Sequence, residues 1–272
     1  MSSKGAYRFL DVGGTFIKCS DGRTVPSNSG GTRAQIAEAL RAAVGDTDGL
    51  DGIGVAIPGP FDFREGIFRM DHKFAAVKGL PFRMLSGVPR EIPLRFLHDV
   101  HALLAGSMKR LDLRGNTALV TLGTGLGFGH ALQGRIQENP MGSPARNLYN
   151  IPCQAGILED SVSARGIRNL YARLTGDIGV SAYEVALRAR AGDLAAMEAY
   201  STTATVLGEY LAPVLEELGI DSLLFGGQVV KSFDLMERPL RNALEGIPKL
   251  ERIAIAPEGA VYEGLATLFE NN

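Results

Sequence analysis

The sequence is poor in cysteine, in long apolar runs and in clustered positive charge. Its 272 residues include only two cysteines, Cys19 and Cys153, too few for a disulfide framework or for a zinc site built from cysteine. No apolar stretch reaches the roughly 18 residues of a membrane-spanning helix, and the N-terminus lacks the apolar run of a signal peptide. These absences predict a reduced, cytoplasmic protein with no membrane partner.

The charge balance excludes a further class of partner. The chain carries 28 Lys and Arg residues against 30 Asp and Glu, a formal net charge of −2, and the basic residues are scattered. A nucleic-acid-binding surface needs a concentrated positive field, so no nucleic-acid partner is expected. With 45% hydrophobic and 21% charged residues, the composition is that of a soluble globular protein.

Apolar periodicity predicts a mixed α/β chain. Buried strands are expected at residues 7–12, 52–57, 95–97, 118–122, 127–132, 222–225 and 252–256. Helices are expected at residues 34–44, 101–111, 164–174, 182–191, 194–218, 233–244 and 260–270. A strand followed by a glycine-rich turn occurs near residue 11 and again near residue 123, which is weak evidence for a duplicated domain facing itself across a cleft.

Glycine is abundant, with 34 residues, and one glycine turn follows the first expected strand. In Asp11-Val12-Gly13-Gly14-Thr15, the two glycines let the backbone approach a ligand closely and present N–H groups to phosphate oxygens. Thr15 adds a hydroxyl, and Asp11 is placed to hold Mg²⁺ through water. Alone, this pattern is equally compatible with an ordinary glycine turn.

Two further glycine turns follow later strands. The first contains Gly123-Thr124-Gly125, but it is neither a Walker loop nor a good dinucleotide fingerprint, because no GK[ST] follows and it lies between strands. The second contains Gly226-Gly227 and is open enough to admit the flat face of a purine. Each turn alone is a weak signal, whereas the order of all three along the chain is much more specific.

With these three motifs in order, the chain resembles the ROK family of sugar kinases and repressors over nearly its whole length. The resemblance implies a two-domain, actin-like (ribonuclease H-like) α/β ATPase fold with a cleft between the domains. The first two glycine turns then correspond to the phosphate loops, and the third packs on adenosine. We expect a smaller domain at residues 1–113, joined by the C-terminal helix at 260–272, and a larger domain at 114–259.

The segment between the phosphate loops contains the expected base. Asp99 follows a strand and precedes a helix, where a carboxylate can orient an attacking hydroxyl and accept its proton. It matches the catalytic aspartate of the family's Asn-Asp-Ala pattern, although His98 replaces the Asn. The competing interpretation is that Asp99 only caps the helix that follows it.

The expected sugar-binding residues match the family unevenly. Pro58 and Gly59 belong to a Pro-Gly-Pro turn similar to the one beside the sugar in relatives, and His98 and Asp99 lie near the same substrate by resemblance. Glu159 matches the Glu of LExxxS that reaches the sugar ring, or it simply favours a helix N-terminus. The usual Gly-Glu-Leu-Gly-His segment is replaced by residues 140–143, which lack its Glu and His.

Other departures concern the metal and the segment at Asp71-His72-Lys73-Phe74, where relatives often place an Asn facing the sugar. The family's zinc-binding CxCGxxGC run is absent, since residues 153–156 keep a single cysteine, and one cysteine cannot hold zinc tetrahedrally. No structural zinc is expected. Together these changes suggest an altered acceptor or weakened sugar binding.

The resemblance implies a glucokinase-like enzyme that uses ATP and Mg²⁺ to phosphorylate a hexose or amino-hexose, with Asp99 as base. Two alternatives remain open: a polyphosphate-dependent glucokinase and a non-catalytic sugar sensor. A repressor is disfavoured because only ten residues precede Asp11, too few for a DNA-binding module. The sequence leaves the sugar, the donor and the competence of the loop at 140–143 open. A homodimer is expected only by analogy with relatives.

Overall fold

The computed structural model describes residues 6–154 and 156–270, and its chain separates into two compact units. Unit 1 contains residues 1–112, 136–145 and 257–272, and unit 2 contains residues 113–135 and 146–256. Unit 1 therefore includes a short insertion and the C-terminal helix as well as the N-terminal part. Within the described ranges, no helix combines the length and apolar character required to cross a bilayer.

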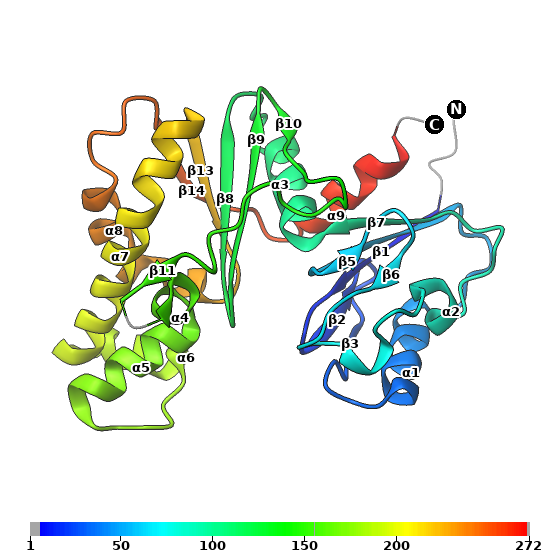
Figure 1. Cartoon of the computed structure of the whole chain (residues 1–272), viewed down its shortest axis with the longest axis horizontal. Coiled ribbons are helices and arrows are strands. Elements are labelled where there is room, and N and C mark those ends of the chain that lie inside the picture. The colour runs from blue at the N-terminus through cyan, green and yellow to red at the C-terminus, as the bar shows by residue number, and fades with distance from the viewer. Residues whose placement is uncertain (1–5, 155, 271–272) are drawn as a thin grey trace. The chain divides into compact units, whose positions relative to one another are not determined.

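Unit 1 is built on a five-stranded sheet of order β3-β2-β1-β4-β7 (Figure 1). Its strands and helices are β1 Tyr7–Val12, β2 Phe16–Cys19, β3 Thr24–Pro26, α1 Arg33–Val44, β4 Gly52–Ile57, β5 Phe61–Asp62, β6 Ile67–Phe68, α2 Phe82–Ser86, β7 Leu94–His98, α3 Asp99–Arg110 and α9 Ala260–Ala266. Short 3₁₀ helices follow at η1 Ala75–Val77 and η3 Thr267–Phe269. Strands β1, β4 and β7 are parallel, and β2 and β3 extend the sheet antiparallel.

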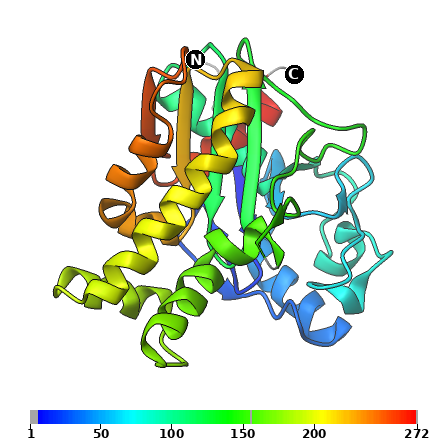
Figure 2. The ribbon, with the colours of Figure 1, turned by 60° about the vertical axis from the view of Figure 1, so that its left-hand side comes forward.

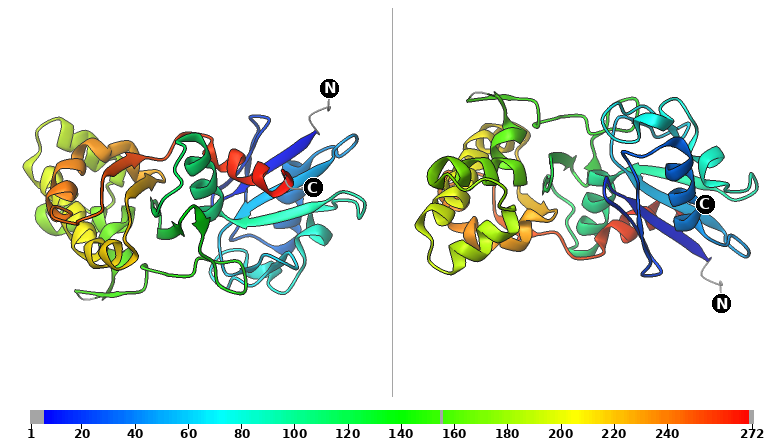
Figure 3. Two further views of the ribbon diagram at one scale, coloured as in Figure 1. Left: turned by 90° about the horizontal axis from the view of Figure 1, so that it is seen from above. Right: turned by 90° about the horizontal axis from the view of Figure 1, so that it is seen from below.

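The central strand β4 is buried along its whole length, as expected for a parallel strand covered on both faces. On one face, Leu10 and Val55 pack with α1 and the β5–β6 segment. On the other, Ala56 packs with Ala102 of α3 and Leu265 of α9. Helices α3 and α9 lie side by side on this second face (Figure 3). Two layers of helices thus fix the sheet from which the candidate base projects.

Unit 2 contains a second five-stranded sheet of order β10-β9-β8-β13-β14. Its elements are β8 Thr117–Leu122, β9 Leu126–Leu132, β10 Arg135–Ile136 (which spans the unit boundary), β11 Pro152–Cys153, β12 Gly156–Ile157, α4 Leu158–Val162, α5 Ala164–Thr175, α6 Ala182–Arg190, α7 Leu194–Leu218, β13 Ser222–Gly226, η2 Val229–Leu235, α8 Glu237–Ala243 and β14 Arg252–Ile255. Strands β8 and β9 correspond to the strands expected at residues 118–122 and 127–132, and they form an antiparallel hairpin. Strand β13 pairs parallel with both β8 and β14.

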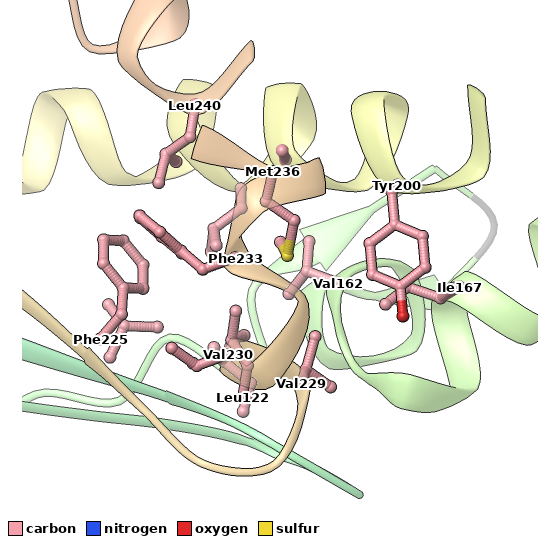
Figure 4. Packing of buried hydrophobic residues seen from close by; sticks show 14 of the residues in the cluster. Leu122, Val162, Ile167, Tyr200, Phe225, Val229, Val230, Phe233, Met236 and Leu240 are labelled. Atoms are coloured by element: carbon pink, nitrogen blue, oxygen red, sulfur yellow. The ribbon is translucent and has the colours of Figure 1, made fainter. Parts of the chain in front are cut away.

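The long helix α7 covers one face of the sheet in unit 2 (Figure 2). Asp193 caps its N-terminus by accepting a hydrogen bond from the Ala196 amide, and Gly219 ends it in the left-handed region. Figure 4 shows the core beneath α7, where the rings of Phe225 and Phe233 lie 5.3 Å apart beside Leu240. This core supports the strand ends that carry the second and third glycine turns.

Two predicted helices differ from the structure. Residues 233–244 form the end of the 3₁₀ helix η2 and then α8, with the break at Met236. Pro239, which lacks an N–H, lies in the first turn of α8, where it is tolerated. The C-terminal helix is α-helical only to Ala266 and continues as η3, and residues 271–272 lie outside the described residues. The sequence analysis also did not predict the short strands β2, β3, β5, β6, β10, β11 and β12 or the short helices α2 and α4.

Candidate active site

Three parallel strands of unit 1 bring the predicted residues to one edge of the sheet. Asp11 of β1 is opposite Ala56 of β4, and Ile57 of β4 is opposite His98 of β7. The carboxyl ends of these strands therefore lie together, which is where α/β sheets place their ligands. Asp11, the turn that begins at Pro58, and Asp99 all occur at this edge.

Asp99 is the first residue of α3, and His98 occupies the N-cap position before it. The Asp99 carboxylate accepts a hydrogen bond of 2.7 Å from the Val100 amide and lies 2.8 Å from Nδ1 of His98. The Asp99 side chain is 39% exposed, which leaves it open to a ligand. Burial raises its pKa, but His98, the Val100 amide and the Lys73 charge outweigh burial and hold the pKa of Asp99 below its ordinary value. Asp99 is thus a carboxylate at neutral pH.

Asp11 has the opposite electrostatic environment. Burial, together with the nearby Asp99 charge, raises the pKa of Asp11 to about 6, and Lys18 compensates only in part. A partly buried carboxylate whose negative charge is not balanced by nearby positive groups favours the binding of a cation. The oxygen donor and the excess negative charge fit Mg²⁺ bound through water. Among the residues described, however, no group of three or more His, Cys, Asp or Glu side chains gathers to hold a metal by itself.

The first glycine turn is held by a network of hydrogen bonds. The Gly13 amide donates to the Phe16 carbonyl at 2.9 Å, which closes the turn between β1 and β2. The Gly14 carbonyl accepts from Ser27 Oγ at 2.7 Å and from Ser29 Oγ at 2.5 Å. Thr15 at the end of the turn is exposed. The turn is therefore rigid and presents a short stretch of backbone to solvent beside Asp11.

Lys73 is a functional candidate that the sequence analysis did not single out. A Cβ built on Gly14 would lie 3.2 Å from Cε and 3.5 Å from Nζ of Lys73, so the ammonium group lies against the first glycine turn. The next residue, Phe74, is fully buried and its amide donates to the Ser29 carbonyl at 2.7 Å, which anchors the segment. A lysine in the segment where relatives carry an Asn was the available signal.

The Pro58-Gly59-Pro60 turn borders the ring of His98. A Cβ on Gly59 would lie 3.4 Å from Nε2 of His98 and 3.6 Å from Oγ of Ser143. Ser143 belongs to the insertion at 136–145, which is part of unit 1. Its loop is ordered by Asn139, whose Oδ1 accepts hydrogen bonds from the amides of Met141 and Ser143. Gly59 therefore leaves a space bordered by two polar atoms.

In unit 2, the Glu159 side chain contacts and stabilises the second glycine turn. Oε2 of Glu159 accepts a 2.9 Å hydrogen bond from the Leu126 amide and lies where a side chain on Gly125 would go. The Gly123 carbonyl accepts from the Ala164 amide at the start of α5, and Thr124 is exposed. The contact of Glu159 with this turn is thus a role that the sequence analysis did not foresee. Its contact with a sugar stays a prediction.

The third glycine turn lies beside the second. Gly226 of β13 is opposite Thr121 of β8, so both strands end at the same edge. Gly227 has a φ of 91°, and a Cβ there would lie 2.3 Å from the Leu122 carbonyl oxygen. Only glycine fits such a backbone contact. The structure thus brings Gly123, Thr124 and Gly125 together with Gly226 and Gly227 in unit 2.

The predicted site residues form two groups, each assembled within one unit. The group in unit 1 comprises Asp11, Gly13, Gly14, Thr15, Pro58, Gly59, His98 and Asp99, joined by Lys73 and Ser143. The group in unit 2 comprises Gly123, Thr124, Gly125, Glu159, Gly226 and Gly227. The first contains a carboxylate with a lowered pKa, Asp99, beside a carboxyl group with a raised pKa, Asp11, and the second contains glycine turns with exposed backbone.

The chain is similar to known proteins along most of its length. The family model described as the ROK family matches residues 22–248. A glucokinase of Halalkalibacterium halodurans is 27% identical over 308 aligned positions, which cover 96% of this chain and 90% of that protein.

Solved structures extend the comparison. A ROK family glucokinase from Streptomyces griseus, solved with glucose and AMPPNP, matches with a TM-score of 0.80 at 21% identity, covering 97% of this chain and 99% of the other. A ROK family transcriptional regulator, a homologue of the E. coli MLC protein, matches with a TM-score of 0.72 at 18% identity, covering 96% and 77%. At these identities the likeness shows the fold.

Proposed function

This chain belongs to the ROK family and has its two-domain, actin-like α/β fold, and from that premise we propose that it is an ATP-dependent sugar kinase acting on a hexose or amino-hexose hydroxyl. The glucokinase relative, which aligns along nearly the whole chain, supports the reaction class, and the neighbour solved with AMPPNP supports ATP as donor.

The observation that carries the proposal is the environment of Asp99. Its carboxylate stands at the carboxyl edge of the sheet, partly exposed, with a pKa held low by His98, the Val100 amide and Lys73 despite burial. It is therefore ionised at neutral pH and fixed in orientation by two neighbours. In the proposed reaction Asp99 accepts the hydrogen bond of the attacking sugar hydroxyl and takes its proton as the phosphoryl group transfers.

The remaining groups of the site would bind the phosphates of the donor and neutralise their negative charge. The first glycine turn, with Gly13, Gly14 and Thr15, and the second turn, with Gly123, Thr124 and Gly125, present backbone N–H groups and hydroxyls that suit phosphate oxygens. Gly226 and Gly227 would contact the adenosine. Asp11 would hold Mg²⁺ through water, and the ion supplies neutralisation of the phosphate charge when it is bound. Lys73 adds a fixed positive charge beside Gly14.

The sugar side of the proposal rests on Pro58, Gly59, His98 and Glu159. Gly59, which follows Pro58, lies beside His98 in unit 1, whereas Glu159 accepts a hydrogen bond from the Leu126 amide in unit 2. A site that recognises hydroxyl groups needs buried polar partners, whose loss costs discrimination. Ser143 is the polar atom nearest to Gly59 in the segment where relatives carry Glu and His. Because residues 140–143 replace the relatives' Glu and His, we expect this chain to prefer a different sugar. The homodimer expected by analogy with relatives stays a prediction.

The test is an ADP-release assay with ATP and Mg²⁺ against a panel of hexoses, amino-hexoses and N-acetylated sugars. We expect turnover with at least one sugar, and a decrease in kcat of about 10³-fold or more in both Asp99→Ala and Asp99→Asn, since neither side chain can accept the proton. Asp48→Asn, which changes an exposed carboxylate, is the matched control and should retain full activity. Turnover that survives in Asp99→Asn would remove Asp99 as the base.

A sugar sensor is the second candidate, supported by the fold shared with a ROK transcriptional regulator and by the replacement of the Glu and His in residues 140–143. The same panel discriminates between the two. Sugar binding by calorimetry without formation of sugar phosphate, with ATP and then with polyphosphate as donor, would favour the sensor. Sugar phosphate that forms only with polyphosphate, which releases no ADP, would keep the kinase and change its donor.

A further inference from the structure

The ring of His98 is held in a single orientation by its neighbours. Its side chain is 14% exposed. The Phe63 ring lies 5.6 Å from it on one side and the His101 ring 5.7 Å away on another. A buried ring packed between two others keeps a fixed orientation, and therefore the two ring nitrogens of His98 face two different environments.

The Nδ1 atom faces the base. It lies 2.8 Å from Oδ1 of Asp99 and 3.3 Å from the Val100 nitrogen. These two contacts demand opposite proton placements, because Nδ1 donates to a carboxylate but accepts from an amide. The Val100 amide already donates to Asp99 Oδ1 at 2.7 Å and does not need His98. An unprotonated Nδ1 would set its lone pair against a carboxylate oxygen at 2.8 Å, which is repulsive. The proton therefore belongs on Nδ1.

The Nε2 atom faces the turn at Gly59. In the neutral ring, a proton on Nδ1 leaves a lone pair on Nε2, which can only accept a hydrogen bond. Nε2 lies 3.4 Å from the position of the Cβ that Gly59 lacks, and Ser143 Oγ lies 3.6 Å from the same point. The space beside Gly59 thus offers one obligate acceptor and one hydroxyl, a combination suited to a hydroxyl group that donates to Nε2 and accepts from Ser143.

We infer that the two nitrogens of His98 have separate functions: Nδ1–H positions the carboxylate of Asp99, and Nε2, with Ser143 Oγ, binds a hydroxyl of the sugar beside Gly59. This inference rests on the proposed sugar kinase function and adds the chemistry of its acceptor site. His98 is a positioning residue through one atom and a specificity residue through the other. The segment 136–145, folded into unit 1, supplies the polar group that completes the pair.

The proton placement can be tested without any activity. Long-range ¹H–¹⁵N spectra of the full chain labelled in histidine report the tautomer of each of its four histidines. The His98 signals are assigned by their absence in His98→Gln. We expect the Nδ1-protonated tautomer at pH 7.5, with a change in Nδ1 shift in Asp99→Ala. A His98 ring protonated at Nε2 would overturn the Nδ1 part of the inference. Titration with D-glucose, without nucleotide, should shift His98 Nε2, and an unchanged Nε2 signal would overturn the second part.

Kinetics then separate the two functions. Asn superposes its amide nitrogen on Nδ1 but lacks a counterpart of Nε2, whereas Gln reaches the position of Nε2 but not of Nδ1. With D-glucose as substrate, His98→Asn should keep kcat within about 3-fold and raise the sugar KM about 10-fold. His98→Gln should lower kcat more than 10-fold with KM within about 3-fold, and Ser143→Ala should raise KM alone. Equal changes of kcat and KM in the two His98 variants, with unchanged melting temperatures, would contradict the division.

A failure of the proposed function is distinguishable from a failure of this inference. If no sugar is phosphorylated, the kinase is wrong, yet the tautomer of His98 and its response to D-glucose still decide the roles of the two nitrogens. If sugar is phosphorylated but His98 is protonated at Nε2, the kinase stands and the positioning role is wrong.

Discussion

At the scale of single residues, the candidate site concentrates charge of both signs around one turn. Lys73 lies against Gly14, contributes to the low pKa of Asp99 and makes no ion pair within 4.0 Å of a described acidic group. Phosphoryl transfer gains most from fixed positive charge at the oxygens of the transferring group. We therefore regard Lys73 as an electrostatic partner of the donor.

Lys73→Met should lower kcat/KM for ATP by about 10²-fold, as loss of one stabilising donor does in other enzymes, and Lys73→Arg should recover part of the loss. Because Lys73 lowers the pKa of Asp99, its removal should also shift the acid limb of the kcat/KM profile to higher pH. The matched control is Lys78→Met, since Lys78 already pairs with Asp71 in the same segment. Equal effects of the two methionine variants would refute the role of Lys73.

At the scale of elements, Asp99 depends on the close packing of α3 against α9. A Cβ on Gly106 would lie 1.7 Å from the Ala260 carbonyl oxygen, and a Cβ on Gly264 would lie 1.9 Å from the Ala102 carbonyl oxygen. Two backbones in direct contact cannot accept a methyl group without separating. Since Asp99 begins α3, a displacement of this helix moves the base.

Gly106→Ala should therefore destabilise the protein by about 3 kcal/mol or more, the range of severe overpacking, and should lower kcat in whatever fraction still folds. Denaturant unfolding followed by circular dichroism measures the first effect. Gly30→Ala is the control, because Gly30 has open space around its Cβ position and should change stability by less than about 1 kcal/mol. A Gly106→Ala protein as stable as Gly30→Ala would show that α3 and α9 can separate at little cost.

The elements also show what the sequence could and could not predict. Long apolar periodicities give β1, β4 and α7 with the observed bounds, because burial on one or two faces leaves a regular pattern. The break before α8, at Met236, was missed although Pro239 signals it, because the apolar spacing continues across Met236. The glycine turns were predictable as motifs. The bond from the Leu126 amide to Glu159 was not, because it joins residues 33 positions apart.

At the scale of the whole molecule, the division into units depends on contacts that leave no recognisable pattern in the local sequence. Residues 136–145 belong to unit 1 although their neighbours on both sides belong to unit 2. No change of composition marks either crossing, and the sequence analysis therefore expects only a boundary near residue 113 and the return of the C-terminal helix at 260–272 to the smaller domain. Residues 136–145 place Ser143 beside Gly59. The sequence alone therefore could not predict where Ser143 lies.

The free energy of unfolding of the whole chain should depend on the uncompensated charge of Asp11. Burial and the Asp99 charge raise the pKa of Asp11 to about 6, from 3.8. Between these two values the folded chain binds the proton more strongly than the unfolded chain, so this carboxylate costs stability as pH rises, and the whole cost is present above pH 6. Asp11→Asn removes the charge and keeps the shape.

With EDTA at pH 7.5, Asp11→Asn should be more stable than the parent by about 1–2 kcal/mol, the full linkage value being reduced because the group is partly exposed to solvent. The gain should vanish near pH 4, and the variant should lose kinase activity with Mg²⁺. Urea unfolding at both pH values, with Asp48→Asn as the exposed control, measures it. A variant less stable than the parent at pH 7.5 without metal would mean that Asp11 is compensated within the chain, and a cation would then not be needed to balance its charge.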